Sequence, residues 1–128
     1  MAFTATITET IDIGGLQISQ SNLYTDEAET RIDKAVADSS TDFLIALVQD
    51  VSETAIVYIV SDQAVTLEFN DSTTGVPTIV LKAGVPYVWY TDSYFTDLLA
   101  TNITKVYVTN ASGSTANVKI RFLYDATP

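Results

Sequence analysis

The sequence predicts an all-β fold, a single-domain antiparallel β-sandwich of jelly-roll type that spans residues 1–128. Apolar and polar residues alternate along many short runs, as expected for strands with one buried face. Clusters of Gly, Pro, Asn, Asp and Ser separate these runs about every eight to twelve residues, a spacing typical of sandwiches and barrels rather than of βαβ units. A chain of 128 residues is also long enough to bury a core without metal or disulfide cross-links.

The first predicted strand is FTATITETIDI at residues 3–13, whose apolar face is interrupted only by Glu9. Gly14-Gly15 suits a tight turn into a second strand over 16–24, but a glycine pair can equally act as a hinge. Residues 1–15 are therefore predicted to form either a strand of the domain's own sheet or an N-terminal arm that pairs with the sheet edge of another protein. The predicted contact residues of such an arm are Phe3, Ile7, Ile11 and Ile13.

The next segment, residues 25–40, fits two kinds of secondary structure. Its apolar residues Ala28, Ile32 and Val36 recur every four positions, which suits one face of a helix and also one face of a strand. We favour a strand, because residues 39–42 then form a polar turn into the following run. That run, residues 43–48, is apolar on both faces and is predicted to be a central strand.

The rest of the chain alternates more regularly and predicts six further strands joined by polar turns: residues 55–60, 65–69, 79–81, 85–90, 105–109 and 117–124. Residues 57–69 resemble residues 106–122, because each segment has a Val-Tyr strand, a polar turn and an alternating run that ends in Phe. This internal similarity predicts two related hairpins.

The charge of the chain excludes some classes of partner. The net charge is −10, and most of the excess acid lies in the first half of the sequence. Such a chain repels phosphate backbones, so we expect no nucleic-acid partner. No apolar run is long enough to span a bilayer, so we expect no membrane partner, and the N-terminus has no secretory signal pattern.

The residue types also restrict the chemistry. The chain contains no His and no Cys, which removes the commonest general base, nucleophile pair and metal ligands. A glycosidase needs a pair of carboxylates. Of the five candidates, Glu68 alone lies outside the predicted turns, and the other four lie in turns, where Asp normally stabilises the backbone: Asp62, Asp71, Asp92 and Asp97. The run Asn70–Gly75 resembles a calcium loop only loosely, and a turn is favoured. We therefore expect no enzyme activity, no cofactor and no metal.

The segment TIVLKAGVPYVWYTD at residues 78–92 holds the only tryptophan, Trp89, and two tyrosines. These rings suit either an exposed platform for a ligand or the interior of a sandwich. We favour the interior for the face that contains Val85, Tyr87 and Trp89, and we predict Tyr90 and Tyr94 as contact residues for a partner.

Three segments of the later two-thirds of the chain, residues 61–72, 81–95 and 105–125, resemble a known group of proteins. They read SDQAVTLEFNDS, LKAGVPYVWYTDSYF and KVYVTNASGSTANVKIRFLYD, and they are similar to small virion structural proteins encoded among the structural genes of tailed bacteriophages. The resemblance covers residues 42–128 and rests on strand and turn signatures without any catalytic residue.

The resemblance implies a capsid decoration, or cement, protein or another minor virion component. It implies a homotrimer that binds the major capsid protein on the capsid surface after synthesis in the host cytoplasm. The hydrophobic content of 47% is high for so acidic a chain and also suggests contacts between subunits. Two alternatives remain open at this point: a non-catalytic carbohydrate-binding β-sandwich module, and a tail or baseplate adaptor.

Overall fold

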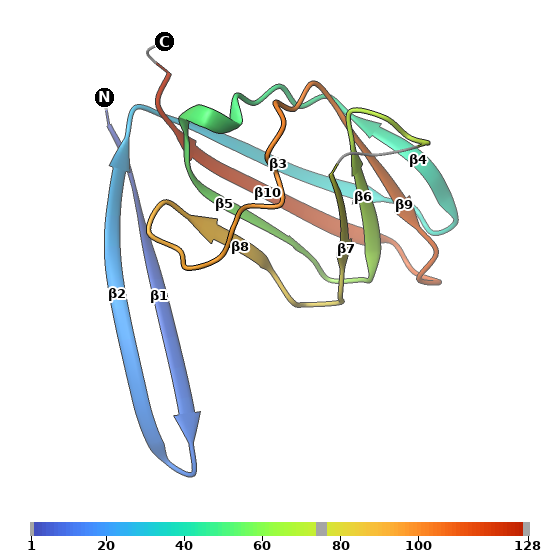
Figure 1. Cartoon of the computed structure of the whole chain (residues 1–128). Helices are drawn as coiled ribbons and strands as arrows, with labels where there is room; N and C mark the ends of the chain where they lie inside the picture. Colours follow the sequence, from blue (N-terminus) through green and yellow to red (C-terminus); the bar gives the residue numbers. More distant parts are fainter. Residues whose placement is uncertain (1, 74–76, 127–128) are drawn as a thin grey trace.

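The structure is a computed structural model that describes residues 2–73 and 77–126, and it consists of ten strands and one short 3₁₀ helix (Figure 1). Their bounds are β1 Phe3–Ile13, β2 Leu16–Asp26, β3 Ala28–Val36, β4 Ser40–Ile45, η1 Val51–Glu53, β5 Thr54–Ser61, β6 Val65–Phe69, β7 Thr78–Leu81, β8 Tyr87–Tyr90, β9 Val106–Asn110 and β10 Ala116–Tyr124. All strand pairs are antiparallel. The predicted all-β, antiparallel class is thus confirmed. Among the described residues, no helix is long and apolar enough to cross a membrane.

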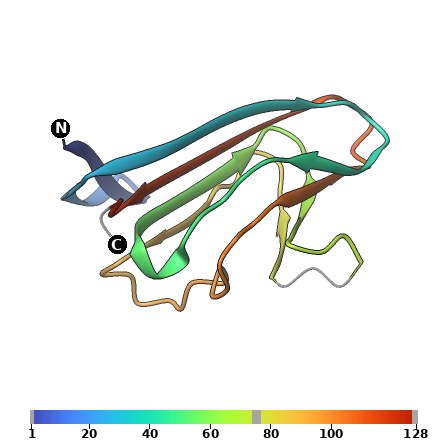
Figure 2. The same cartoon turned by 90° about the horizontal axis from the view of Figure 1, so that it is seen from above.

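Eight of the strands form the body of the molecule as two four-stranded sheets (Figures 1 and 2). Sheet I has the order β3-β10-β5-β8, and sheet II has the order β4-β9-β6-β7. One hydrophobic core lies between them and draws side chains from both, including Val57, Ile59 and Phe122 of sheet I and Leu67 and Phe69 of sheet II. These side chains come from alternate strand positions, as a sheet with one buried face requires.

Strand β3 confirms the favoured interpretation of residues 25–40. It pairs with β10 along its whole length, from Ala28 opposite Tyr124 to Val36 opposite Ala116. Of its inward positions, Ala28, Thr30 and Ile32 are half-buried and Val36 is buried, whereas Lys34 and the positions on the other face are exposed. Ala28, Ile32 and Val36, which are spaced four residues apart, therefore lie on one face of a strand. Thr30, between the first two, faces the same way and is also half-buried.

The structure contradicts the prediction of two related hairpins. Strands β5 and β6 lie in different sheets, and so do β9 and β10. The similar segments 57–69 and 106–122 are therefore arches that cross from one sheet to the other. Their sequences look like hairpins because an arch, like a hairpin, joins two half-buried strands by a short polar turn. The two arches are joined by Asp62 in the turn after β5, which accepts hydrogen bonds from the backbone N–H and the side chain of Asn117 on β10 at 2.7 and 2.8 Å.

The prediction of a central strand at residues 43–48 is also wrong. Strand β4 ends at Ile45 and lies at the edge of sheet II, where it pairs with β9 alone. Ile45 and Leu47 point into the core, but Leu44 and Val48 are exposed. One apolar face of this run, with Ile45 and Leu47, is covered by the core, and the other, with Leu44 and Val48, is left uncovered.

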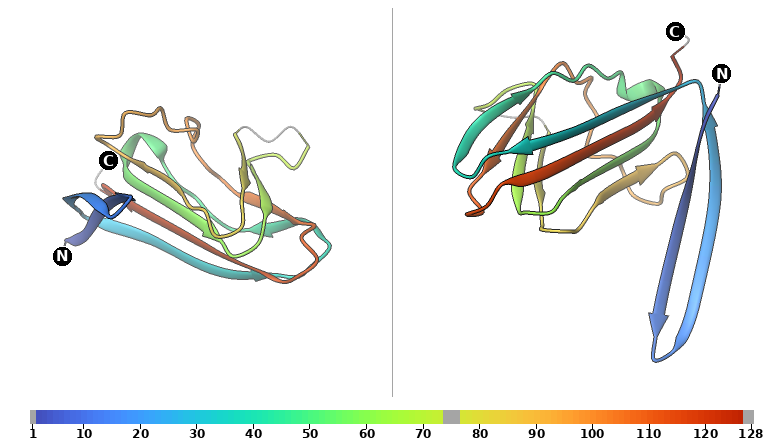
Figure 3. Two further views of the ribbon diagram at one scale, coloured as in Figure 1. Left: turned by 90° about the horizontal axis from the view of Figure 1, so that it is seen from below. Right: turned by 180° about the vertical axis from the view of Figure 1, so that it is seen from behind.

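The remaining strands, β1 and β2, form a separate two-stranded sheet that projects from one side of the body (Figures 1 and 3). The pairing runs without a break from Phe3 opposite Asp26 to Ile13 opposite Leu16. Gly14 and Gly15 make the turn with φ of 60° and 85°, values that favour glycine, and the side chain of Asp12 accepts the N–H of Gly15 at 3.0 Å. We call this element the hairpin. In the described residues β1 pairs with β2 alone, rather than with either sheet of the body.

Candidate binding surfaces on and beside the hairpin

The far end of the hairpin carries four exposed aliphatic side chains on one face. Cross-strand pairing places Ile11 opposite Ile18 and Ile13 opposite Leu16, so all four point to the same side. Their exposed fractions range from 52% to 79%. We call these four residues the tip patch.

Near the turn, the two faces of the hairpin differ in chemistry. The face opposite the tip patch carries hydroxyl groups, and two cross-strand pairs there are bonded at 2.9 Å, Thr8 with Ser21 and Thr10 with Ser19. Between residues 10 and 25 the only charged side chain is Asp12, which lies on the hydroxyl face. The tip patch is thus an uncharged aliphatic surface on an otherwise very acidic protein.

The root of the hairpin is held more closely than its tip. On β1, Phe3, Ala5 and Ile7 are half-buried, and every residue from Thr8 to the turn is exposed. On the outer face of sheet I, near this root, Ile56 and Leu123 are buried although they lie outside the main core. The hairpin is therefore packed at one end and uncovered at the other.

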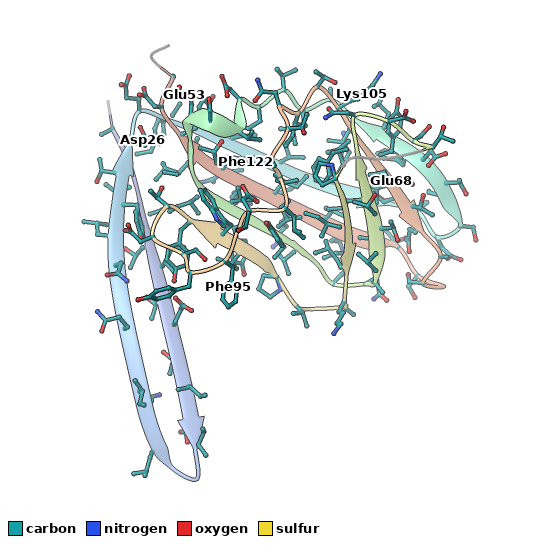
Figure 4. The ribbon with its side chains drawn as sticks, viewed as in Figure 1. Asp26, Glu53, Glu68, Phe95, Lys105 and Phe122 are labelled. Atoms are coloured by element: carbon teal, nitrogen blue, oxygen red, sulfur yellow. The ribbon has the colours of Figure 1, made fainter. Side chains whose placement is uncertain are left out.

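A groove of about 890 Å³ separates the hairpin from β8 and the loop that follows it. Five of its lining residues are aromatic: Tyr24, Tyr58, Tyr90, Tyr94 and Phe95. Its polar lining residues are Thr6, Thr8, Glu9, Gln20, Asn22, Asp92 and Ser93. Figure 4 shows the side chains of this region and labels Phe95 on the loop after β8. We call this the hairpin groove.

Two tyrosine–carboxylate hydrogen bonds hold the hairpin against the body at the base of this groove. The Tyr90 hydroxyl donates to Glu9 of β1, and the Tyr24 hydroxyl of β2 donates to Asp92 at 3.2 Å. The two tyrosine rings also touch, with 5.9 Å between their centroids. In the first bond the donor lies on the body and the acceptor on the hairpin, and in the second bond these positions are exchanged. We call this pair of hydrogen bonds the clasp.

The clasp changes the acidity of both phenols. The hydrogen bond to Glu9, followed by desolvation, raises the pKa of Tyr90 to about 12. Desolvation and the bond to Asp92 raise the pKa of Tyr24 above its ordinary value. In both residues the neutral phenol is the form that donates to the carboxylate, so the clasp requires protonated tyrosines.

The loop after β8, residues 91–99, is tied down at both ends. Thr91 bonds the carbonyl of Ala55 through its backbone N–H at 2.9 Å, and the indole N–H of Trp89 donates to the carbonyl of Phe95 at 3.0 Å. At the far end Asp97 accepts the Tyr87 hydroxyl at 2.5 Å and the N–H of Leu99 at 3.0 Å. Burial, and then the bond to Asp97, raises the pKa of Tyr87 well above its usual range. The loop therefore presents its side chains from a defined position.

The structure places five of the six predicted contact residues on the two surfaces. Ile11 and Ile13 belong to the tip patch, whereas Ile7, Tyr90 and Tyr94 line the hairpin groove. Phe3 is half-buried at the root and belongs to neither surface. Sequence reasoning missed Leu16 and Ile18, although the register set by a two-residue turn at Gly14-Gly15 would have placed them opposite Ile13 and Ile11. It also missed Glu9, whose signal was a lone charge on an apolar face.

The predicted core face of β8 is only partly enclosed. Tyr87 and Trp89 are half-buried and pack against the core, as the interior interpretation required. Val85, however, precedes the strand and is more than half exposed. β8 lies at the edge of sheet I, so solvent reaches the strand from one side.

The carboxylates that were weighed as catalytic groups serve local structure in this fold. Asp62 joins the turn after β5 to β10, and hydrogen bonds from Asn117 lower its pKa below the usual value. Asp92 belongs to the clasp, Asp97 holds a loop, and Asp71 accepts the N–H of Thr73 at 2.7 Å. Glu68 is half-buried on β6.

The calcium-like run Asn70–Gly75 ends in residues 74 and 75, which lie outside the described residues. Its first residue, Asn70, joins this loop to another, because its side chain accepts the N–H of Thr104 at 2.7 Å and donates to the carbonyl of Asn102 at 2.9 Å. In the described part of the chain, no group of three or more Asp and Glu side chains could hold a metal ion.

Comparison of the chain with protein-family models, with curated proteins and with solved structures returned no match. The functional argument therefore rests on the tip patch and the hairpin groove.

Proposed function

We propose that the chain is a structural protein of a tailed bacteriophage particle. In this proposal it is a capsid decoration protein that assembles as a homotrimer and binds the major capsid protein on the capsid surface. The observation that carries the proposal is the tip patch at the end of the projecting hairpin. The sequence resemblance of residues 42–128 supplies the class of particle and the trimeric state.

The composition of the tip patch supports a role in attachment to another protein. Charged residues are depleted at the centre of protein–protein interfaces, and the tip patch contains no charged side chain. Soluble proteins rarely leave contiguous apolar side chains uncovered, so the four exposed aliphatic side chains of the tip patch support a surface that another molecule covers. An isolated two-stranded hairpin is also marginally stable in water, so a partner at its tip would stabilise it.

The reach of the hairpin supports the same role. Each strand has eleven residues, which at roughly 3.3 Å per residue extends about 35 Å. In the described residues, both strands keep an unpaired outer edge along this length. Such an edge can accept a strand of a shell protein through main-chain hydrogen bonds while the tip patch fills an apolar depression.

The jelly-roll connectivity belongs to this proposal. The body has eight strands in two sheets, β3-β10-β5-β8 and β4-β9-β6-β7. Among the described strands, each successive connection in the body changes sheet except the one from β6 to β7. A pattern of this kind is expected of a jelly roll, an architecture found in viral capsid domains and in lectins. The hairpin would then be an addition before the first jelly-roll strand.

The test compares the tip patch with equally exposed apolar residues of the body. In the tip variant, Ile11, Ile13, Leu16 and Ile18 are each replaced by Thr, which keeps strand propensity. In the control variant, Leu44, Val48 and Val80, all exposed on the body, are replaced by Thr. Each purified protein is added to phage particles that lack it, and the particles are sedimented and assayed for bound protein.

We expect the original and control proteins to sediment with the particles and the tip variant to remain in solution. Light scattering of the free proteins then gives the oligomeric state, with a trimer expected. Binding of the tip variant at the level of the original protein would overturn the role of the hairpin. Antibody labelling of the tail instead of the head would replace the decoration role with that of a tail or baseplate adaptor.

A further inference from the structure

We propose that the hairpin groove is a binding site for an uncharged polysaccharide. This goes beyond attachment to the capsid, because it uses a different surface from the tip patch. It would give a decoration protein a second binding activity.

The charges around the groove determine the class of ligand. Among the described residues that line it there is no Lys and no Arg, so the groove offers nothing to neutralise a phosphate, sulfate or uronate. Its two carboxylates, Glu9 and Asp92, would repel such groups. Both can instead accept hydrogen bonds from the hydroxyl groups of a neutral sugar, as can Thr6, Thr8 and the amides of Gln20 and Asn22.

The aromatic side chains supply the second half of sugar recognition. Tyr94 is fully exposed, and Phe95 beside it is 82% exposed. Exposed rings of this size are expected to be covered by a ligand or partner, because each could bury about 150–250 Å². A flat ring can pack against the apolar C–H face of a pyranose while polar neighbours bond to its hydroxyl groups.

The loop that carries these rings is held in place, which lowers the entropic cost of binding. The Phe95 backbone is fixed by the Trp89 indole, and its N–H bonds the Ser93 hydroxyl at 3.3 Å. Asp97 and Tyr87 anchor the end of the loop. The platform is therefore organised before any ligand arrives.

The volume and the polar lining of the groove favour a chain of sugars over other occupants. At about 890 Å³ it falls within the range of ligand sites, roughly 300–1,000 Å³. The tip patch of a second copy fits it less well, because four aliphatic side chains would desolvate the amides of Gln20 and Asn22 and the remaining acceptor sites of Glu9 and Asp92 without bonding them. A polyhydroxylated ligand can satisfy those groups.

The test is a titration of the full chain with uncharged polymers of glucose, mannose, galactose and N-acetylglucosamine, with polygalacturonate as an anionic comparison. Binding is followed by calorimetry and by Trp89 emission, since the indole is bonded to the backbone of Phe95. The test variant is Tyr94→Ala with Phe95→Ala. The matched control is Leu98→Ala, which removes an exposed apolar side chain from the same loop but outside the groove.

We expect at least one neutral polymer to bind and polygalacturonate to fail. The double variant should keep its melting temperature and bind about tenfold more weakly or worse, equivalent to about 1.4 kcal/mol, whereas Leu98→Ala should bind as the original does. The inference is overturned if no neutral polymer binds, or if the double variant binds unchanged. It is also overturned if the double variant turns an oligomer into a monomer and no polymer binds, because the groove is then a subunit interface.

This titration uses isolated protein without phage particles. Its failure would leave the capsid-attachment result standing, and failure of attachment would leave the sugar result standing.

Discussion

The body and the hairpin use the same apolar amino acids in opposite ways. In the body, Ile59 and Ile120 point between two sheets and are fully buried. In the hairpin, Ile11 and Ile18 alternate with polar residues just as regularly, yet they face solvent. The comparison teaches that alternation specifies a strand with an apolar face, whereas the covering layer decides whether that face becomes a core.

The tip of the hairpin has no covering layer because the hairpin is longer than the part of the body that it packs against. The hairpin extends beyond the edge of the body, so the outer face of sheet I covers only its root (Figure 1). Phe3 and Ile7 are consequently half-buried, whereas Ile13 and Leu16 at the turn are more than two-thirds exposed. The apolar face of one strand thus changes from packing surface to contact surface along its length.

The largest expected effect comes from removing the covered isoleucine. Ile59→Ala should lower the free energy of unfolding by about 2–5 kcal/mol, because it removes buried methyl groups and leaves a cavity between the sheets. Urea unfolding followed by circular dichroism measures the change. A loss below about 1 kcal/mol would mean that the inter-sheet core is loosely packed, and the contrast with the hairpin would disappear.

An intermediate effect is expected from alkaline pH, which should release the hairpin from the body. A free tyrosine in the unfolded chain titrates near pH 10, whereas the bond to Glu9 raises the pKa of Tyr90 to about 12. The folded pKa is the higher one, so the clasp contributes fully below about pH 10 and is lost as the pH rises toward 12. Tyrosinate absorbance should therefore show the Tyr90 phenol titrating above pH 10, toward pH 12.

Two variants check this assignment. Tyr90→Phe should remove one late-titrating phenol, and Glu9→Gln should bring the titration of Tyr90 back toward that of a free tyrosine, because the carboxylate is the largest cause of the shift. If the phenol that Tyr90→Phe removes titrates near pH 10 in the original protein, the clasp does not hold in solution.

The smallest expected effect is that of the uncovered isoleucine. Ile18→Ala makes the same chemical change as Ile59→Ala, but its side chain is 72% exposed. Unfolding should change by no more than about 0.5 kcal/mol, as is usual for surface substitutions. A cost comparable with that of Ile59→Ala would show that the tip patch is already buried in the free protein, for example against a second copy.

Much of the fold could be predicted from local pattern. Alternation located strands such as β1, β6 and β10, and the Gly14-Gly15 pair located the hairpin turn, because period and turn chemistry are properties of neighbouring residues. The partners of each strand could not be predicted in the same way. A polar turn such as residues 61–64 closes a hairpin or an arch equally well, so β5 and β6 were wrongly paired.

The candidate surfaces were predictable only in part, for the same reason. The apolar face of β1 and the exposed Tyr94 were recognised from the sequence, but the groove between them requires β1 and β8 to meet across some eighty positions of sequence. The bond between Glu9 and Tyr90 depends on that meeting. The residues next to Glu9 and Tyr90 in the sequence do not indicate this hydrogen bond, so the sequence shows Glu9 only as an interruption of the apolar face of the strand.

The position of β10 between β3 and β5 has a consequence for the order in which the molecule forms. The body cannot close until its last strand has been made, because Ala28 pairs with Tyr124. The hairpin needs only residues 3–26, and hairpins form in roughly 1–10 μs. Synthesis at about 5–20 residues per second delays β10 by several seconds. On a growing chain all residues of the hairpin are therefore present well before the body closes, and a chaperone or an assembly partner that bound them at this stage would stabilise an otherwise marginal element.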